Sequence, residues 1–199
     1  MVDTKILHFI RKQGGYVQTH ELIRHGVHTR DIKRLLNMKK IERVKAGLYR
    51  LTNLEYTPEH EYVELCLAIP KAVICLYTAL SQYELTTYAP TAIMISLPKG
   101  YHAPKIEHPP FVTYRFSVKQ YQAGIQKIRS GAGLYRIYDA EKSICDVFRF
   151  RRKLGDDTAK EALFEYLNRK SKDLEKLVRY SKLCRVYNIM KPYMEARLG

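Results

Sequence analysis

Four residues in the second half of the chain have the types and spacing that could carry out hydrolysis. Asp139, Glu141 and Asp146 are carboxylates, and Lys142 lies among them. In metal-dependent nucleases, carboxylates hold a divalent cation and activate a water, and an adjacent Lys assists. A metal-dependent nuclease that uses Asp139 and Glu141 is therefore one hypothesis for this chain.

The same four residues also fit the start of a helix. Asp139 can be its N-cap, and Glu141 then lies in the first turn, where the helix dipole stabilises an acid. Lys142 and Asp146 are four residues apart, so we expect them to pair on the solvent face. Nuclease Glu-x-Lys pairs usually lie on a strand, so we favour the structural interpretation and expect no catalytic residues and no enzyme.

Other common reactive or metal-binding motifs are missing from the sequence. The seven histidines show no metal-ligand spacing such as His-Glu-x-x-His, and the glycines form no phosphate loop. The four cysteines are far apart and lie in apolar patterns, which argues against a disulfide framework and fits a reducing compartment. We therefore expect no metal, no cofactor and a cytoplasmic location.

Charge indicates an acidic partner. The chain has 199 residues with 35 Lys and Arg against 20 Asp and Glu, a net charge of +15. Residues 1–54 carry +8 of this, so they are about three times as charge-dense as the remaining 145 residues. Nucleic acid, an anionic membrane or an acidic protein could each be the partner. No apolar run approaches the roughly 20 residues of a membrane span, and we expect neither a secretory signal nor a membrane partner.

The pattern of residues 1–54 predicts a DNA-binding fold. Apolar residues at helical spacing indicate three short helices, with Thr19 and Thr29 as N-caps of the second and third. Residues 41–51 form two extended runs around Ala46-Gly47, which indicates a hairpin with Tyr49 packed beneath it. Three helices and a hairpin make a winged helix-turn-helix.

In a helix-turn-helix, the second helix of the motif enters the major groove of DNA. If Ile32, Leu35 and Leu36 face the core, the basic residues of that helix face outwards. Cations of the hairpin would then lie along the DNA backbone or in the minor groove. The predicted DNA-binding residues are Thr19, His28, Thr29, Arg30, Lys33, Arg34, Arg43, Lys45 and Arg50. A basic solvated helix face and a protein-docking module are the alternatives.

The remaining chain mixes helices and strands. Residues 53–57 are a predicted linker. The patterns predict helices near 58–68 and 78–85, strands at 92–97, 111–116 and 134–138, a loop at 99–110, and helices from residue 139 onwards. We therefore predict an α+β protein: an N-terminal winged helix-turn-helix over residues 1–54, followed by an α/β domain over residues 55–199 with a small sheet and a helical C-terminal tail.

A basic run, Arg149 to Lys153, ends the predicted helix that starts near Asp139. Cations stabilise the C-terminus of a helix, and this interpretation is the favoured one. A second nucleic-acid contact is the alternative.

The sequence resembles the AbiEi family, the antitoxins of type IV toxin–antitoxin systems in bacterial phage abortive infection. The resemblance rests on an ordered set of segments in both halves of the chain. They are residues 6–14, Gly15-Tyr16-Val17, the helix at Thr19, Gly47-Leu48-Tyr49-Arg50, Thr78-Ala79-Leu80, residues 134–138, residues 139–146, Ala159-Lys160-Glu161-Ala162-Leu163 and Leu174-Glu175-Lys176-Leu177.

The resemblance implies a phage-defence function. The protein would repress its own operon by binding promoter repeats through residues 1–54. Its second domain would counter a nucleotidyltransferase-like toxin without forming a stable complex with it. The residues alone also allow a plain winged-helix transcription regulator whose second domain binds a ligand or a protein.

Overall fold

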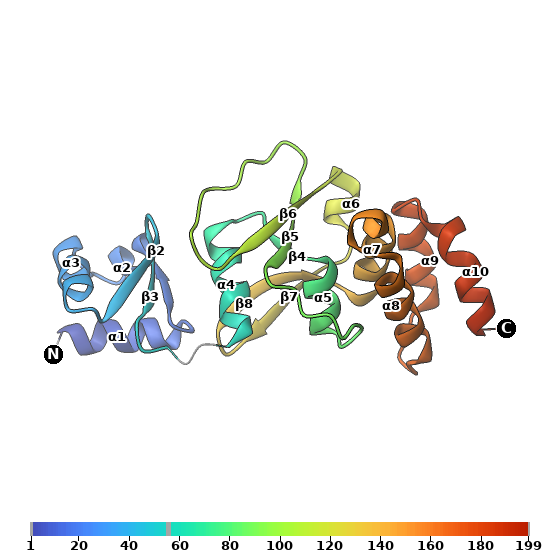
Figure 1. The fold of residues 1–199 in the computed structure, drawn as a ribbon. Coiled ribbons are helices and arrows are strands. Elements are labelled where there is room, and N and C mark those ends of the chain that lie inside the picture. Colours follow the sequence, from blue (N-terminus) through green and yellow to red (C-terminus); the bar gives the residue numbers. More distant parts are fainter. Residues whose placement is uncertain (1, 55–56, 199) are drawn as a thin grey trace. The chain divides into compact units, whose positions relative to one another are not determined.

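The computed structural model describes residues 2–54 and 57–198 (Figure 1). Their contacts form two compact units. Unit 1 comprises Met1–Pro70, His102–Pro109 and Ile128–Tyr135, and unit 2 comprises Lys71–Tyr101, Pro110–Lys127 and Arg136–Gly199. The domain boundary after residue 54 stays a prediction, and residues 55–56 of the predicted linker lie outside the described residues.

Unit 1 contains the winged helix-turn-helix predicted from the sequence. Its elements are α1 (Val2–Lys12), β1 (Tyr16–Gln18), α2 (Thr19–Arg24), α3 (Thr29–Asn37), β2 (Ile41–Lys45), β3 (Leu48–Leu51) and α4 (Pro58–Ala68). The strands form an antiparallel sheet in the order β1-β3-β2. The hairpin β2–β3 turns at Gly47, whose φ of 80° is one that residues with a side chain rarely adopt.

The N-caps of α2 and α3 differ from the prediction by one residue. Gln18 and His28 are the caps, and Thr19 and Thr29 are already the first helical residues. The difference arises from an acidic residue three positions after each cap. The Glu21 carboxylate accepts the Gln18 backbone N–H at 2.7 Å, and the Asp31 carboxylate accepts that of His28 at 3.3 Å.

A small apolar core holds α1, α2 and α3 against the three-stranded sheet. It contains the fully or almost fully buried residues Ile6, Ile10, Val17, Leu22, Val27, Ile32, Leu35, Ile41, Tyr49 and Leu51. Leu35 is 0% and Ile32 4% exposed, which fixes the face of α3 that points away from solvent. Tyr49 is 6% exposed, so the prediction that it packs beneath the hairpin is confirmed.

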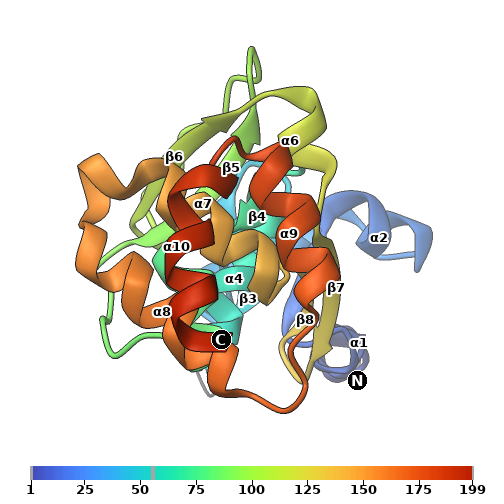
Figure 2. The ribbon, with the colours of Figure 1, turned by 90° about the vertical axis from the view of Figure 1, so that its right-hand side faces the viewer.

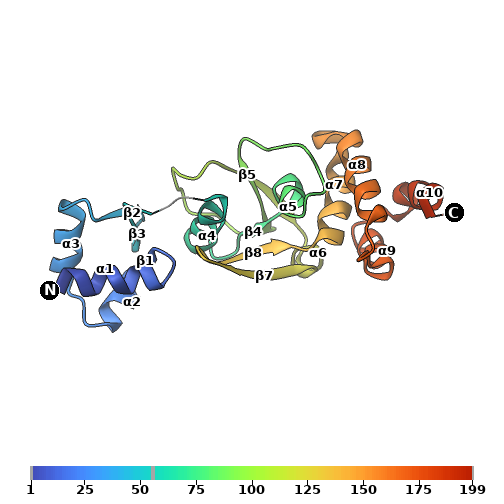
Figure 3. The same cartoon turned by 90° about the horizontal axis from the view of Figure 1, so that it is seen from below.

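The second sheet has five strands in the order β6-β5-β4-β8-β7. Their bounds are β4 (Val73–Ile74), β5 (Ile93–Pro98), β6 (Phe111–Phe116), β7 (Ile125–Ser130) and β8 (Gly133–Tyr138). β5 pairs in parallel with β6 and antiparallel with β4, which in turn pairs in parallel with β8. Strands β7 and β8 lie side by side (Figure 3). The three predicted strands are present, and β4 and β7 were not predicted.

The remaining regular elements of the described residues are helices. They are α5 (Leu76–Gln82), α6 (Val118–Gln122), α7 (Ala140–Leu154), α8 (Asp156–Asn168), α9 (Leu174–Leu183) and α10 (Tyr187–Leu198). α7 packs against α5, α8 and α9, and α10 packs against α8 and α9 (Figure 2). The core of unit 2 joins these helices to side chains of β4, β6 and β8. The predicted α+β class and helical C-terminal tail are confirmed.

Candidate nucleic-acid interface

The outward face of α3 presents basic side chains at its N-terminal half. Arg30 and Lys33 are exposed, and so are His28 and Thr29 at the start of the helix. Within the part of the chain that the structure describes, no carboxylate lies at ion-pair distance from Arg30 or Lys33. Because Ile32 and Leu35 are buried, the helix cannot rotate these cations away from solvent. Arg30 and Lys33 can therefore reach an external anion without breaking an internal contact.

Arg34 lies on the same helix but is already paired. Its guanidinium forms ion pairs with Asp3 of α1 and with Asp31, the second at 3.0 Å. The hydrogen bond to Asp3 raises the pKa of Arg34. This pair ties α3 to the start of α1, so Arg34 positions the helix whether or not it also contacts a ligand.

The hairpin places its three cations differently. Arg43 is exposed and its guanidinium carbon lies 5.9 Å from the centre of the Tyr49 ring. The Lys45 ammonium instead donates to the carbonyl oxygen of Ala68, the last residue of α4, at 2.8 Å. Arg43 thus shares the exposure of the α3 cations, whereas Lys45 fastens the hairpin to α4.

Arg50 is bound to two carboxylates. Its guanidinium lies 2.7 Å from Glu42 of β2 and 2.7 Å from Glu64 of α4. The Glu64 side chain is 2% exposed and also accepts a hydrogen bond from the Tyr16 hydroxyl at 3.2 Å. Burial lowers the pKa of Arg50, but the hydrogen bond to Glu42 and the charge of Glu64 outweigh it, so the pKa is raised overall.

Thr19 supports the turn of the hairpin. It is half-buried, and its backbone N–H donates to the carbonyl oxygen of Gly47 at 2.9 Å. The predicted DNA-binding residues thus fall into two groups by their surroundings. His28, Thr29, Arg30, Lys33 and Arg43 are exposed, whereas Thr19, Lys45, Arg50 and the equally exposed Arg34 are bound to other parts of unit 1. The DNA contacts of both groups stay predictions.

The sequence analysis did not predict the acidic residues that form ion pairs with Arg34 and Arg50. Asp3 is 31 residues from Arg34, and Glu64 is 14 residues from Arg50. Residues so far apart leave no periodic signal. The hydrophobic pattern around Glu64 could have marked it as buried, because Val63 and Leu65 flank it and both are core residues.

The carboxylates at the start of α7 form hydrogen bonds and ion pairs within unit 2. Asp139 caps α7 as predicted, accepting the Lys142 backbone N–H at 2.9 Å. Its other oxygen lies 3.1 Å from the Lys176 ammonium, and Glu141 accepts from the Tyr166 hydroxyl at 2.6 Å. Burial raises the pKa of Asp139, whereas the pKa of Glu141 is lowered because hydrogen bonds from Tyr166 and Lys176 outweigh its burial.

The prediction that Lys142 and Asp146 pair on the solvent face is wrong. They do pair, at 2.6 Å, but both side chains are 0% exposed. The Lys142 ammonium lies 4.2 Å from the centre of the Tyr138 ring and 4.8 Å from that of Phe116. The i, i+4 spacing suits a buried pair as well as an exposed one, and here the face carrying it packs against the sheet.

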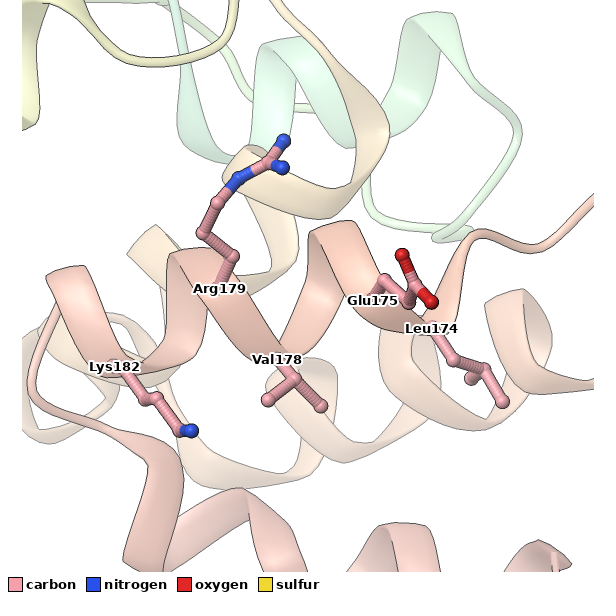
Figure 4. Close-up of a pocket in the computed structure, with 5 residues that line it drawn as sticks. All are labelled: Leu174, Glu175, Val178, Arg179 and Lys182. Atoms are coloured by element: carbon pink, nitrogen blue, oxygen red, sulfur yellow. The ribbon is translucent and has the colours of Figure 1, made fainter.

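Among the described residues, no group of three or more His, Cys, Asp or Glu side chains is placed to hold a metal ion. An open groove follows α9 and is lined by Leu174, Glu175, Val178, Arg179 and Lys182 (Figure 4). Among the described helices, none is long and apolar enough to cross a membrane.

Comparison with known proteins identifies the N-terminal part of the chain. Residues 5–52 match the family described as "Transcriptional regulator, AbiEi antitoxin". No curated protein matches the chain. The matched residues extend from α1 to the end of the hairpin and contain the exposed cations described above, while the resemblance of the later segments stays a prediction. Over residues 5–52, the chain is therefore similar to the AbiEi antitoxin family of transcriptional regulators.

Proposed function

We propose that this protein is a DNA-binding autorepressor and the antitoxin of a type IV toxin–antitoxin system in phage abortive infection. It binds repeats in the promoter of its own operon through residues 1–54, and it counters a nucleotidyltransferase toxin encoded beside it without a stable complex. It acts without catalysis, because the carboxylates of the alternative nuclease hypothesis are occupied by internal hydrogen bonds and ion pairs.

One observation carries the DNA-binding part of this proposal. Arg30 and Lys33 lie on the outward face of α3, and Arg43 lies on the adjoining hairpin, all exposed. Arg can bind guanine with two hydrogen bonds in the major groove, and Lys neutralises phosphates. A rigid helix that presents both types to solvent suits the groove of a duplex.

The test compares two double variants of the full-length protein. Arg30→Ala with Lys33→Ala removes two exposed cations of α3, and Arg11→Ala with Lys12→Ala removes two at the end of α1. We expect the α3 variant to lose about 10- to 100-fold in affinity for promoter DNA in a fluorescence-anisotropy titration. Because Lys33 is the expected phosphate contact of the two, the salt dependence should become shallower by roughly one counterion.

The α1 variant is the matched control, with the same loss of charge. It should bind promoter DNA within about threefold of the wild type, since general charge acts weakly at a distance in physiological salt. Equal loss in both variants would mean that unit 1 attracts DNA through its net charge only, and α3 would not be the recognition element.

A second experiment separates repression from neutralisation. The α3 double variant is co-expressed with the neighbouring nucleotidyltransferase gene, and growth and promoter activity are measured together. We expect growth rescue to persist while repression is lost. Loss of both, with the variant still folded, would contradict the assignment of the two activities to different parts of the chain.

A further inference from the structure

The basic run at the end of α7 divides into two sets of side chains. The Arg151 guanidinium donates to the Phe148 carbonyl oxygen at 2.9 Å and lies 3.7 Å from Asp156. Arg152 is exposed. Arg149 and Lys153 are four residues apart, so they lie on one face of α7, about one turn from each other.

Three aromatic rings lie next to the side chains of Arg149 and Lys153. Tyr114 and Phe116 come from β6, and Phe150 comes from α7. The Phe150 ring lies 5.1 Å from that of Tyr114 and 5.6 Å from that of Phe116, centre to centre, in edge-on arrangements. All these residues belong to unit 2.

The two cations rest on these rings. The Arg149 guanidinium carbon lies 5.0 Å from the centre of Phe150 and 5.3 Å from that of Phe116. The Lys153 ammonium lies 5.0 Å from the centre of Tyr114. Cation–π attraction thus holds two positive charges next to each other.

No carboxylate of the described residues lies at ion-pair distance from Arg149 or Lys153. Asp146, one turn before Arg149, is bound to Lys142 at 2.6 Å and to the Cys184 thiol at 3.4 Å. Its charge also attracts Arg149, but at a distance longer than that of an ion pair.

Arg149 also has an unused hydrogen-bond donor. Its Nη1 atom is buried and has no hydrogen-bond partner within the part of the chain that the structure describes. Buried donors are almost always paired, because an unpaired one loses its hydration without compensation. Arg149 lies more than one turn before the end of α7, so the helix dipole does little to stabilise its charge.

We propose that Arg149 and Lys153 form a phosphate-binding site above the rings of Tyr114, Phe116 and Phe150. Arg149 is half-buried, so the accessible part of its guanidinium donates to the phosphate, and Lys153 adds a charge within one helical turn. A terminal phosphate carries up to two negative charges and two adjacent backbone phosphates carry one each, so either can balance both cations, whereas a carboxylate balances only one. The phosphate can belong to a small phosphorylated molecule or to a nucleic-acid backbone.

The experiment uses the full-length protein and two probes, inorganic pyrophosphate and a 12-nucleotide single-stranded RNA. Binding is measured by isothermal titration calorimetry for wild type, Arg149→Met, Lys153→Met and the control Arg152→Met. Met keeps an apolar stem over the rings and removes the charge. We expect Arg149→Met and Lys153→Met each to weaken binding of at least one probe about tenfold. Arg152→Met, which removes the same charge from the same helix, should change binding less than about twofold.

The two probes distinguish the sources of the phosphate. Loss of pyrophosphate binding in the Arg149 and Lys153 variants assigns the site to a small phosphorylated molecule, and loss confined to the RNA assigns it to a nucleic-acid backbone. Failure of both probes to bind the wild type, or equal weakening by Arg152→Met, would overturn the proposal. Lys153 is exposed, so its variant decides the question even if Arg149→Met does not fold. The site lies in unit 2, so the result is independent of promoter binding by α3.

Discussion

The strongest prediction about stability concerns the buried ion pair between Lys142 and Asp146. Replacing Lys142 by Met preserves much of the side-chain volume but leaves the Asp146 carboxylate without its cation. Both groups are 0% exposed, and breaking a fully buried pair by removing one partner typically costs about 3–5 kcal/mol. The lost contacts with the Tyr138 and Phe116 rings act in the same direction.

The total stability of a domain is about 5–15 kcal/mol, so this loss is a large fraction of it. Urea unfolding followed by circular dichroism measures it. Lys170→Met is the matched control, because Lys170 is exposed and surface substitutions change stability by no more than about 0.5 kcal/mol. The double variant Lys142→Met with Asp146→Leu removes both charges and should recover most of the stability.

The pH dependence of the single variant gives an independent check. Burial raises the pKa of Asp146, and Lys142 opposes that shift. Without Lys142 the pKa in the folded state rises further above its unfolded value. The folded state then binds more protons than the unfolded one, so stability falls as the pH rises through this range and returns on acidification.

We therefore expect the cost of Lys142→Met to be smaller at pH 5 than at pH 8. A cost below about 1 kcal/mol at pH 8 would refute the reasoning, since it would mean that water or another cation reaches Asp146. An equal cost at both pH values would show that the loss comes from packing alone.

Two further predictions concern other buried groups. Glu64→Gln removes one of the two negative charges paired with Arg50, and it should lower the free energy of unfolding by about 1–3 kcal/mol. Urea unfolding measures this change. An unchanged free energy would contradict a stabilising role of the Glu64 charge. Burial raises the pKa of Cys184 to about 12, so iodoacetamide at pH 8 should label Cys184 far more slowly than the partly exposed Cys66 in the folded protein. Mass spectrometry of the labelled peptides measures both rates, and equal rates would contradict the burial of Cys184.

Local signals in the sequence predicted the elements that depend on local chemistry. The hairpin over residues 41–51 follows from two extended runs around Ala46-Gly47, and the start of α7 follows from Asp139 as its cap. The caps of α2 and α3 differ from the prediction by one residue because Thr is a favoured N-cap, whereas the Glu21 and Asp31 carboxylates accept the backbone N–H groups of Gln18 and His28. Strand β4 has only two residues, Val73–Ile74, too few to show any alternation.

The parts that could not be predicted depend on residues distant in the chain. The spacing of Lys142 and Asp146 is that of any helical ion pair, and only the packing of α7 on the sheet makes it buried. Likewise, a cation in a basic segment looks the same in sequence whether it is exposed, as Arg30 is, or bound to a distant acid, as Arg50 is. Composition therefore predicted the charge of the candidate interface but not which of its cations are available.

The division of the cations in unit 1 bears on how DNA affinity would be distributed among them. For Arg34 or Arg50 to bind a phosphate, each must share or break contacts with two carboxylates, so the gain from the phosphate is reduced by what is lost inside the protein. Arg30 and Lys33 lose only their hydration. Most of the affinity should then depend on the exposed residues of α3 and on Arg43, while Arg34 and Arg50 act by holding α3 and the hairpin in place. Substituting Arg50 would therefore weaken DNA binding chiefly through the position of the hairpin, with little change in the salt dependence of the affinity.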